Sequence, residues 1–182
     1  MSKFAINKTK ITIPEPSGIG EAEVLFNYSI SGHYPTVNAT RLQLSHNRTK
    51  ELLVKASRIR RHYDGTGAEQ SVTCIAASNT HTALLAMFEA AFRAPLAEPA
   101  KFGRDGSWCY VTRYGTDPMK VFSWSPFGLS GDALFVACIA DVVKVLMKNN
   151  LTNSGRSFKS LELEDDLISR MNTATQSLVQ TH

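Results

Sequence analysis

The chemistry that stands out in the sequence is a run of basic side chains, KASRIRRHYDGTG at residues 55–67. With the segment before it, residues 41–61 contain seven Lys and Arg against one acid, Glu51, a local net charge of +6 in a chain of net charge +4. Clustered cations bind nucleic acid because they displace the counterions condensed on its phosphates, and arginine adds bidentate contacts. A solvated charged surface is the simpler alternative. The candidate phosphate-binding residues are Arg41, Arg48, Lys50, Lys55, Arg58, Arg60 and Arg61, with Tyr63 beside them.

A second candidate surface is the aromatic segment SWCYVTRYGTDPMKVFSWSPFG at residues 107–128. It contains both tryptophans of the chain, with Arg and Lys between the rings. Aromatic rings interleaved with cations hold single-stranded nucleic acid by stacking on its bases, with little sequence preference. Burial in the core is the alternative, because aromatic residues in strands are common core residues. The positions that we assign to stacking and phosphate contact are Trp108, Tyr110, Arg113, Tyr114, Lys120 and Trp124.

The sequence contains no familiar catalytic or metal-binding motif. A phosphate-binding GxxxxGK[ST] loop, CxxC, HExxH and GxSxG are all missing, and the three cysteines and five histidines lack metal-ligand spacing. We therefore expect no cofactor, no metal site and no enzymatic activity. An enzyme without a familiar motif is the competing hypothesis, and it requires His46, His62 and nearby acids to converge in a cleft.

Composition points to a globular protein outside the membrane. Hydrophobic residues make up 43% of the chain and charged residues 20%. The longest apolar run, at residues 134–147, is too short and too charged to span a membrane. The segment MSKFAINKTK lacks the apolar core of a signal peptide. These features predict a cytoplasmic protein without a membrane partner.

Alternating apolar and polar residues predict strands at residues 3–13, 21–30 and 36–45, joined by short connections into an antiparallel meander. Residues 50–63 fit either a helix or a strand. As a strand they pair through the turn DGTG with AEQSVTCIAA, which sets Ile59 opposite Val72 and His62 opposite Glu69. We favour this hairpin over the helix.

Helical periodicity predicts three helices, at residues 79–94, 132–148 and 160–178. Asn79 or Thr80 would cap the first helix, and acids occupy the first turn of the last one. The aromatic segment is expected to form a hairpin over residues 107–125. The sequence thus predicts a single α+β domain, residues 1–182, in which an antiparallel sheet, rich in residues 1–77, packs with about three helices mainly in the C-terminal half.

Together these features predict a nucleic-acid-binding protein, most simply a non-sequence-specific binder of single-stranded DNA. It would act as an accessory to replication, recombination or transcription, and its size suits a phage or plasmid protein. No basic recognition helix is evident, which argues against readout of a duplex major groove. We also expect a homo-oligomer, with the last two helices as candidate interfaces. A protein-interaction module or assembly subunit, with a protein partner at the acidic start of the last helix, remains the alternative.

Overall fold

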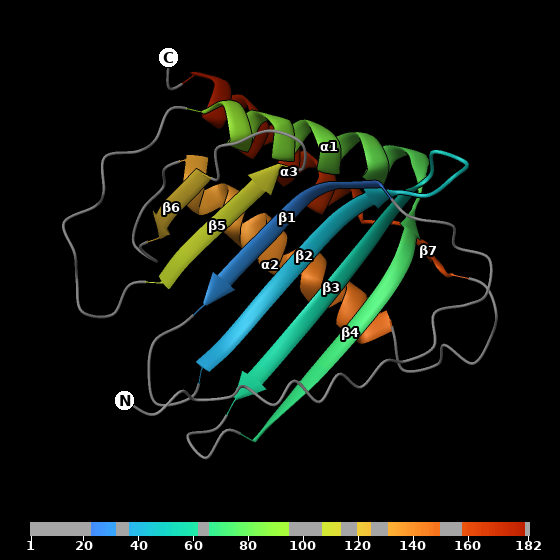
Figure 1. Cartoon of the computed structure of the whole chain (residues 1–182). Coiled ribbons are helices and arrows are strands. Elements are labelled where there is room, and N and C mark those ends of the chain that lie inside the picture. The colour runs from blue at the N-terminus through green and yellow to red at the C-terminus, as the bar shows by residue number, and fades with distance from the viewer. Residues whose placement is uncertain are drawn as a thin grey trace.

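A single sheet backed by three helices makes up the part of the chain that the computed structural model describes, residues 23–31, 37–61, 66–94, 107–113, 120–124, 131–149 and 158–180 (Figure 1). The strands are β1 Glu23–Ser31, β2 Val37–His46, β3 Leu52–Arg61, β4 Gly67–Ala76, β5 Ser107–Arg113, β6 Lys120–Trp124 and β7 Ser160–Leu161. The helices are α1 Ser78–Arg93, α2 Gly131–Asn149 and α3 Asp165–Gln180. The predicted α+β class, with helices mainly in the C-terminal half, is confirmed.

The strands follow the order β6-β5-β1-β2-β3-β4-β7 across the sheet. Every neighbouring pair is antiparallel except β4 and β7, which are parallel. β1 and β2 match the strands predicted at residues 21–30 and 36–45, and β5 with β6 forms the predicted aromatic hairpin. The strand predicted at residues 3–13 lies outside the described residues.

The connection between β2 and β3 is a tight turn built by Asn47. Its side-chain oxygen accepts hydrogen bonds from the backbone N–H groups of Thr49, at 3.0 Å, and of Glu51, at 2.8 Å. Short Asn side chains stabilise turns in this way, because they replace a backbone acceptor locally. Lys50 completes the turn in the left-handed region, with φ of 61°. The turn therefore places Arg48 and Lys50 at the opposite end of β3 from Arg58 and Arg60.

Residues 52–61 form a strand, so the hairpin interpretation is confirmed and the helix alternative is wrong. The predicted register is also wrong: Ile59 lies opposite Glu69, and Val72 lies opposite Ala56. The predicted pairing was offset by three residues, and an odd offset turns one strand over relative to its neighbour. In the observed register buried Ala56 faces buried Val72, whereas the predicted register would turn Val72 away from the core. His62 lies outside the described residues.

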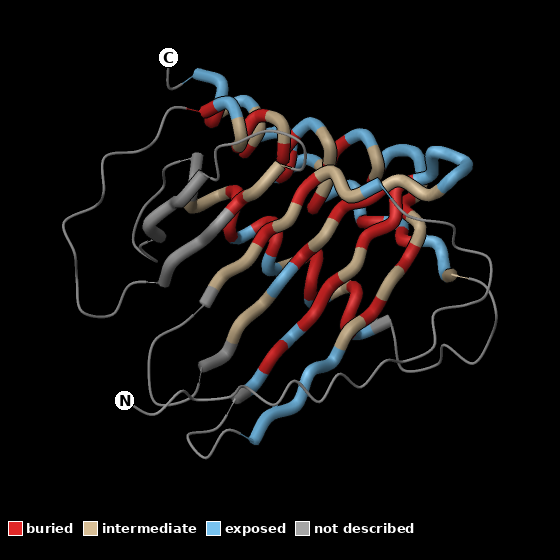
Figure 2. The backbone as a smooth tube through the Cα atoms, viewed as in Figure 1, coloured by how far each residue is buried: buried red, intermediate tan, exposed pale blue. Residues whose placement is uncertain are grey.

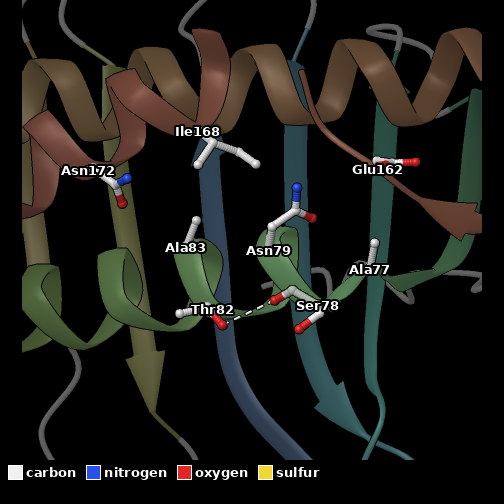
Figure 3. A pocket seen from close by; sticks show the side chains of 8 residues that line it. All are labelled: Ala77, Ser78, Asn79, Thr82, Ala83, Glu162, Ile168 and Asn172. Carbon is white, nitrogen blue, oxygen red and sulfur yellow. Dashed lines mark hydrogen bonds between the residues drawn. The ribbon is translucent and has the colours of Figure 1, made fainter. Parts of the chain in front are cut away.

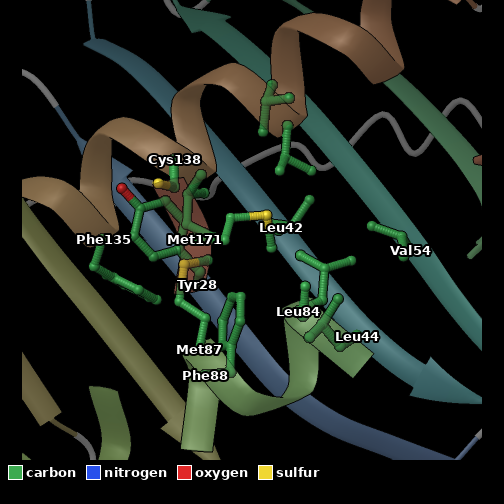
Figure 4. Close-up of a cluster of buried hydrophobic side chains, with 14 of the residues drawn as sticks. Tyr28, Leu42, Leu44, Val54, Leu84, Met87, Phe88, Phe135, Cys138 and Met171 are labelled. Carbon is green, nitrogen blue, oxygen red and sulfur yellow. The ribbon is translucent and has the colours of Figure 1, made fainter. Parts of the chain in front are cut away.

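The hydrophobic core lies between the helices and one face of the sheet. Strand residues such as Tyr28, Leu42 and Val54 meet helix residues such as Phe88 and Phe135 there (Figure 4). The Phe135 ring contacts Tyr28 and Phe88 edge to face, with ring centroids 5.8 Å and 5.3 Å apart. α2 is buried over most of its circumference, as its sequence predicted. None of the helices in the described ranges is long and apolar enough to cross a membrane.

The start of α1 differs from the prediction. The N-cap residue is Ala77 rather than Asn79 or Thr80, and it forms no side-chain capping hydrogen bond. The Asn79 side-chain oxygen accepts the first-turn N–H of Thr80 at 2.7 Å from inside the helix. Thr80 is instead fully buried inside the first turn, where its hydroxyl accepts a hydrogen bond from the backbone N–H of Leu163 at 3.1 Å. A tertiary contact therefore uses the hydroxyl that the sequence assigned to a local cap.

The last helix also begins later than predicted. α3 starts at Asp165 rather than at residue 160, because residues 160–161 form β7. The backbone N–H of Ile75 donates to the carbonyl of Lys159 and that of Ala77 to the carbonyl of Leu161, which holds this segment extended beside β4. The first turn of α3 keeps two acids, Asp165 and Asp166, where the helix dipole favours negative charge.

Candidate nucleic-acid interface

The face of the sheet opposite the helices carries a broad group of polar side chains. We call it the open face, because no described helix packs on it (Figure 1). Successive side chains in a strand point to opposite faces, so the strand residues that pack in the core against the helices, such as Phe26, Leu42 and Val54, assign the alternate positions to the open face. Its described side chains are Val24, Asn27, Ser29, Ala39, Arg41, Gln43, Ser45, Leu53, Lys55, Ser57, Ile59, Glu69, Ser71, Thr73, Ile75 and Thr112. Four of them, Ser45, Leu53, Ser57 and Ile59, are nevertheless buried.

Two adjacent rows across the middle of the open face contain only polar residues among the side chains that the structure describes, and we call them the polar band. The first row is Thr112, Asn27, Gln43, Lys55 and Thr73, and the second is Ser29, Arg41, Ser57 and Ser71. Neither row contains a carboxylate. The first row crosses five strands, a width of about 19 Å at the usual strand spacing. The polar band therefore places hydroxyl and amide groups around two cations, the exposed Arg41 and the half-buried Lys55, although the hydroxyl residue Ser57 on β3 is itself buried.

The basic segment of β3 does not form one continuous phosphate grip. Lys55 points to the open face, whereas Arg58 and Arg60 occupy the alternate positions, on the face that carries the helices. Both arginines are nevertheless exposed, because the ends of β3 and β4 extend beyond the cover of the helices (Figure 2). Arg61 is described by its backbone alone, opposite Gly67 and Val37. Strand alternation thus divides the predicted cluster between two faces.

Many cations elsewhere in the described chain form ion pairs. Lys50 lies 3.1 Å from Glu23, Arg170 lies 2.8 Å from Asp141, and Arg113, Arg93 and Lys144 have acidic partners as well. Arg41, Arg48, Lys55, Arg58 and Arg60 form no ion pair with any described residue. Within the described chain, the cations of β2 and β3 are therefore not neutralised internally.

Arg113, another predicted ligand cation, is half-exposed and already has partners within the protein. Its guanidinium lies 3.1 Å from a carboxylate oxygen of Glu89 and 5.7 Å and 5.8 Å from the ring centres of Phe26 and Phe92. Residue 113 lies opposite Phe26, on the face that carries the helices. The structure therefore separates Arg113 from the polar band.

The aromatic positions are described only in part. Backbone pairing places Trp108 opposite Ser31 and Tyr110 opposite Ser29, at the β5 end of the sheet. Lys120 and Trp124 are the two ends of β6, the outermost strand beyond β5. Tyr63 and Tyr114 lie outside the described residues.

A histidine pair that the sequence did not indicate lies where β2 meets α1. The rings of His46 and His81 are 5.8 Å apart, and Glu23 lies opposite His46 in the register of β1 and β2. Burial, and then the neighbouring His81 and Lys50, lower the pKa of His46 below its usual value, while Glu23 opposes this shift. The two histidines are thirty-five positions apart in the sequence, so no motif spacing could have predicted that they would meet. The described residues contain no group of three or more His, Cys, Asp or Glu side chains suited to a metal ion.

An open pocket of about 590 Å³ lies between the start of α1 and α3 (Figure 3). Ser78, Asn79 and Thr82 line it from α1, and Ile168 and Asn172 from α3. Glu162 is the one ionisable side chain among its lining residues, whereas the enzyme hypothesis requires at least two in contact. The pocket also lies apart from the polar band, on the helical side of the molecule.

The chain matches no protein-family model, and searches of curated proteins and of solved structures found no similar protein. The functional argument therefore depends on the charges, hydrogen-bonding groups and shape of the molecule itself.

Proposed function

We propose that this protein binds single-stranded nucleic acid on the open face of its sheet. Arg41 and Lys55 would contact phosphates, and the hydroxyl and amide groups of the polar band would contact sugars and base edges. The observation that carries the proposal is the placement of these two cations, without an acidic partner among the described residues, inside rows that contain no carboxylate. Such a surface attracts a phosphate backbone without first having to break an internal ion pair.

The form of the surface favours a single strand over a duplex. A duplex presents its base edges inside grooves, which a helix or a narrow two-stranded ribbon can enter but a broad sheet cannot. A single strand can lie across the polar band, with unpaired bases accessible to Ser, Thr, Asn and Gln side chains. Arg58 and Arg60 would extend the contact around the end of the sheet, where both are exposed.

The test is a titration of labelled single strands, oligo(dT) and oligo(U), and of a matched duplex, followed by fluorescence anisotropy at several salt concentrations. Arg41→Ala with Lys55→Ala should weaken binding of a single strand by about ten-fold or more, because each loses a charge-assisted contact. The matched control is Lys144→Ala with Lys148→Ala, which removes two exposed cations from α2 and should leave the affinity almost unchanged.

Two results would contradict the proposal. One is the lack of any single-strand binding at low salt. The other is an equal loss in the two double variants, since this would show a response to net charge rather than to the polar band. A third double variant, Arg58→Ala with Arg60→Ala, measures the contribution of the sheet end separately.

A further inference from the structure

Two side-chain amides lie side by side in the polar band. Asn27 on β1 is directly opposite Gln43 on β2 in the register of these strands, and both belong to the open face. Directly opposed residues of an antiparallel pair have Cβ atoms about 4.5–5.5 Å apart, so the two amides can contact the same ligand group. They are the only amides among the described side chains of the polar band.

Both amides are available to a ligand. No described residue forms a hydrogen bond with the side chain of Asn27 or Gln43, and both residues are half-buried. The one buried side-chain atom without a hydrogen-bond partner in the described chain belongs to Glu89, so the two amides reach solvent. Hydrogen bonds are stronger where the local dielectric constant is low. A half-buried amide without an internal partner is therefore better placed to select a ligand than a fully hydrated one.

The chemistry of an amide suits one base in particular. A side-chain amide holds a donor and an acceptor side by side, so it can form two hydrogen bonds with one base edge, whereas a Ser or Thr hydroxyl offers a single oxygen. Adenine fits this pattern on two edges, because its N6 amino group donates while N7 or N1 accepts beside it. Pyrimidines lack N7, and guanine presents two acceptors, N7 and O6, at the corresponding edge.

We propose that Asn27 and Gln43 recognise adenine in a single strand bound to the polar band. This inference rests on the proposed nucleic-acid binding and adds a base preference to it. Lys55 lies directly opposite Gln43 on β3, and Asn27 lies two strand spacings, about 10 Å, from Lys55. A nucleotide whose phosphate contacts Lys55 can thus place its base over the two amides. The cation holds the backbone, and the amides select the base.

Arg41 is the other described side chain of the polar band that can form two hydrogen bonds with a base. It lies two positions before Gln43 on β2, on the same face. A guanidinium group has donors only, so it fits the two acceptors of guanine and not the donor and acceptor of adenine. The identity of the preferred base therefore distinguishes selection by the amides from selection by Arg41.

Fluorescence anisotropy tests the preference with labelled oligo(dT) in which a short central run is replaced by deoxyadenosine, deoxycytidine or deoxyguanosine. The strand with adenine should bind about ten-fold more tightly than unmodified oligo(dT), as expected for one bidentate base contact. Asn27→Leu with Gln43→Met removes both amides at similar side-chain size and should bring these two strands to equal affinity. The matched control, Asn172→Leu with Gln176→Met at exposed positions of α3, should keep the preference.

A change in the ligand tests the same contact without altering the protein. Replacing the central adenine bases by unsubstituted purine removes the N6 amino group and leaves both ring nitrogens. The unchanged chain should then bind this strand no more tightly than oligo(dT), because each amide loses its donor partner on the base.

Equal affinity of the unchanged chain for all of these strands overturns the base recognition and leaves the proposed single-strand binding intact. The base recognition is also overturned by an adenine preference that survives in Asn27→Leu with Gln43→Met, or by a guanine preference that Arg41→Ala removes. If no strand binds even at low salt, the proposed function fails together with this inference.

Discussion

Arg41 and Arg113 carry the same guanidinium group in different surroundings. Arg41 is exposed on the open face, among Ser, Gln and Lys neighbours. Arg113 lies against two phenylalanine rings and the carboxylate of Glu89. A cation that already has an internal partner must lose that partner before it can contact a phosphate. Arg41 is therefore the better ligand candidate, and Arg113 the better structural residue.

Replacing Arg113 by Met tests this distinction. The change should leave the affinity for a single strand unchanged and lower the free energy of unfolding by on the order of 1 kcal/mol, since a half-exposed ion pair and two ring contacts are lost. Denaturant unfolding and anisotropy measure the two quantities. If the variant kept its full stability but bound the single strand more weakly, Arg113 would instead be part of the binding surface.

His46 should make the stability of the protein depend on pH. Burial, His81 and Lys50 hold the pKa of His46 below its usual value, so the unfolded chain binds a proton more readily than the folded chain. The contribution of His46 is therefore complete above the unfolded value of about 6.5 and is lost as the pH falls through the lower folded pKa.

Urea unfolding at about pH 7.5 and at about pH 5, for the unchanged chain and for His46→Gln, measures this contribution. The unchanged chain should lose more stability than the variant on acidification. An equal loss in both would show that other groups, and not His46, control the acid response.

At the scale of the elements, Thr80 connects α1 to the segment between β7 and α3. The hydroxyl of this buried residue accepts the Leu163 N–H across eighty-three positions of sequence. Thr80→Val keeps the shape of the side chain but leaves a buried N–H without an acceptor, which should lower the free energy of unfolding by about 1–3 kcal/mol. Thr82→Val, two positions along and exposed, should change it by less than about 0.5 kcal/mol. Equal effects of the two changes would contradict the role of this hydrogen bond.

The packing of α2 against the sheet depends on Phe135. This fully buried ring contacts Tyr28 from β1 and Phe88 from α1. Phe135→Ala should lower the free energy of unfolding by about 3–5 kcal/mol through lost burial and a new cavity. Ala140→Ser, on the exposed side of the same helix, should have little effect, and denaturant unfolding of both variants checks the comparison.

At the scale of the whole molecule, the described sheet separates a helical side, where the core and many ion pairs lie, from the open face with its polar band. Binding on the open side should depend strongly on salt, because each phosphate contact releases counterions. For a single strand, the slope of log affinity against log salt is about −0.7 for each phosphate neutralised. Removing Arg41 and Lys55 should therefore make the slope less negative by about 1.4, whereas removing Lys144 and Lys148 should not change it. A common slope in both double variants would argue against phosphate contacts at the polar band.

Strand and helix patterns in the sequence predicted β1, β2, the β3–β4 hairpin, the aromatic hairpin and α2 close to their observed bounds. Register and helix starts were less predictable from the sequence. The offset between β3 and β4 depends on which residues of both strands face the core, and the start of α3 depends on backbone bonds to β4. These are long-range interactions, whereas a sequence pattern reports only local periodicity.

For the candidate site, the sequence by itself determined that cations gather in residues 41–61 and that acids are scarce there. Only the tertiary structure decided which of these cations share a surface. Strand alternation sends Lys55 and Arg58 to opposite faces, the β2–β3 register brings Arg41 into the row beside Lys55, and the approach of α1 to β5 pairs Arg113 with Glu89. Charge is a property of each residue, but a binding surface is a property of neighbours that the fold brings together.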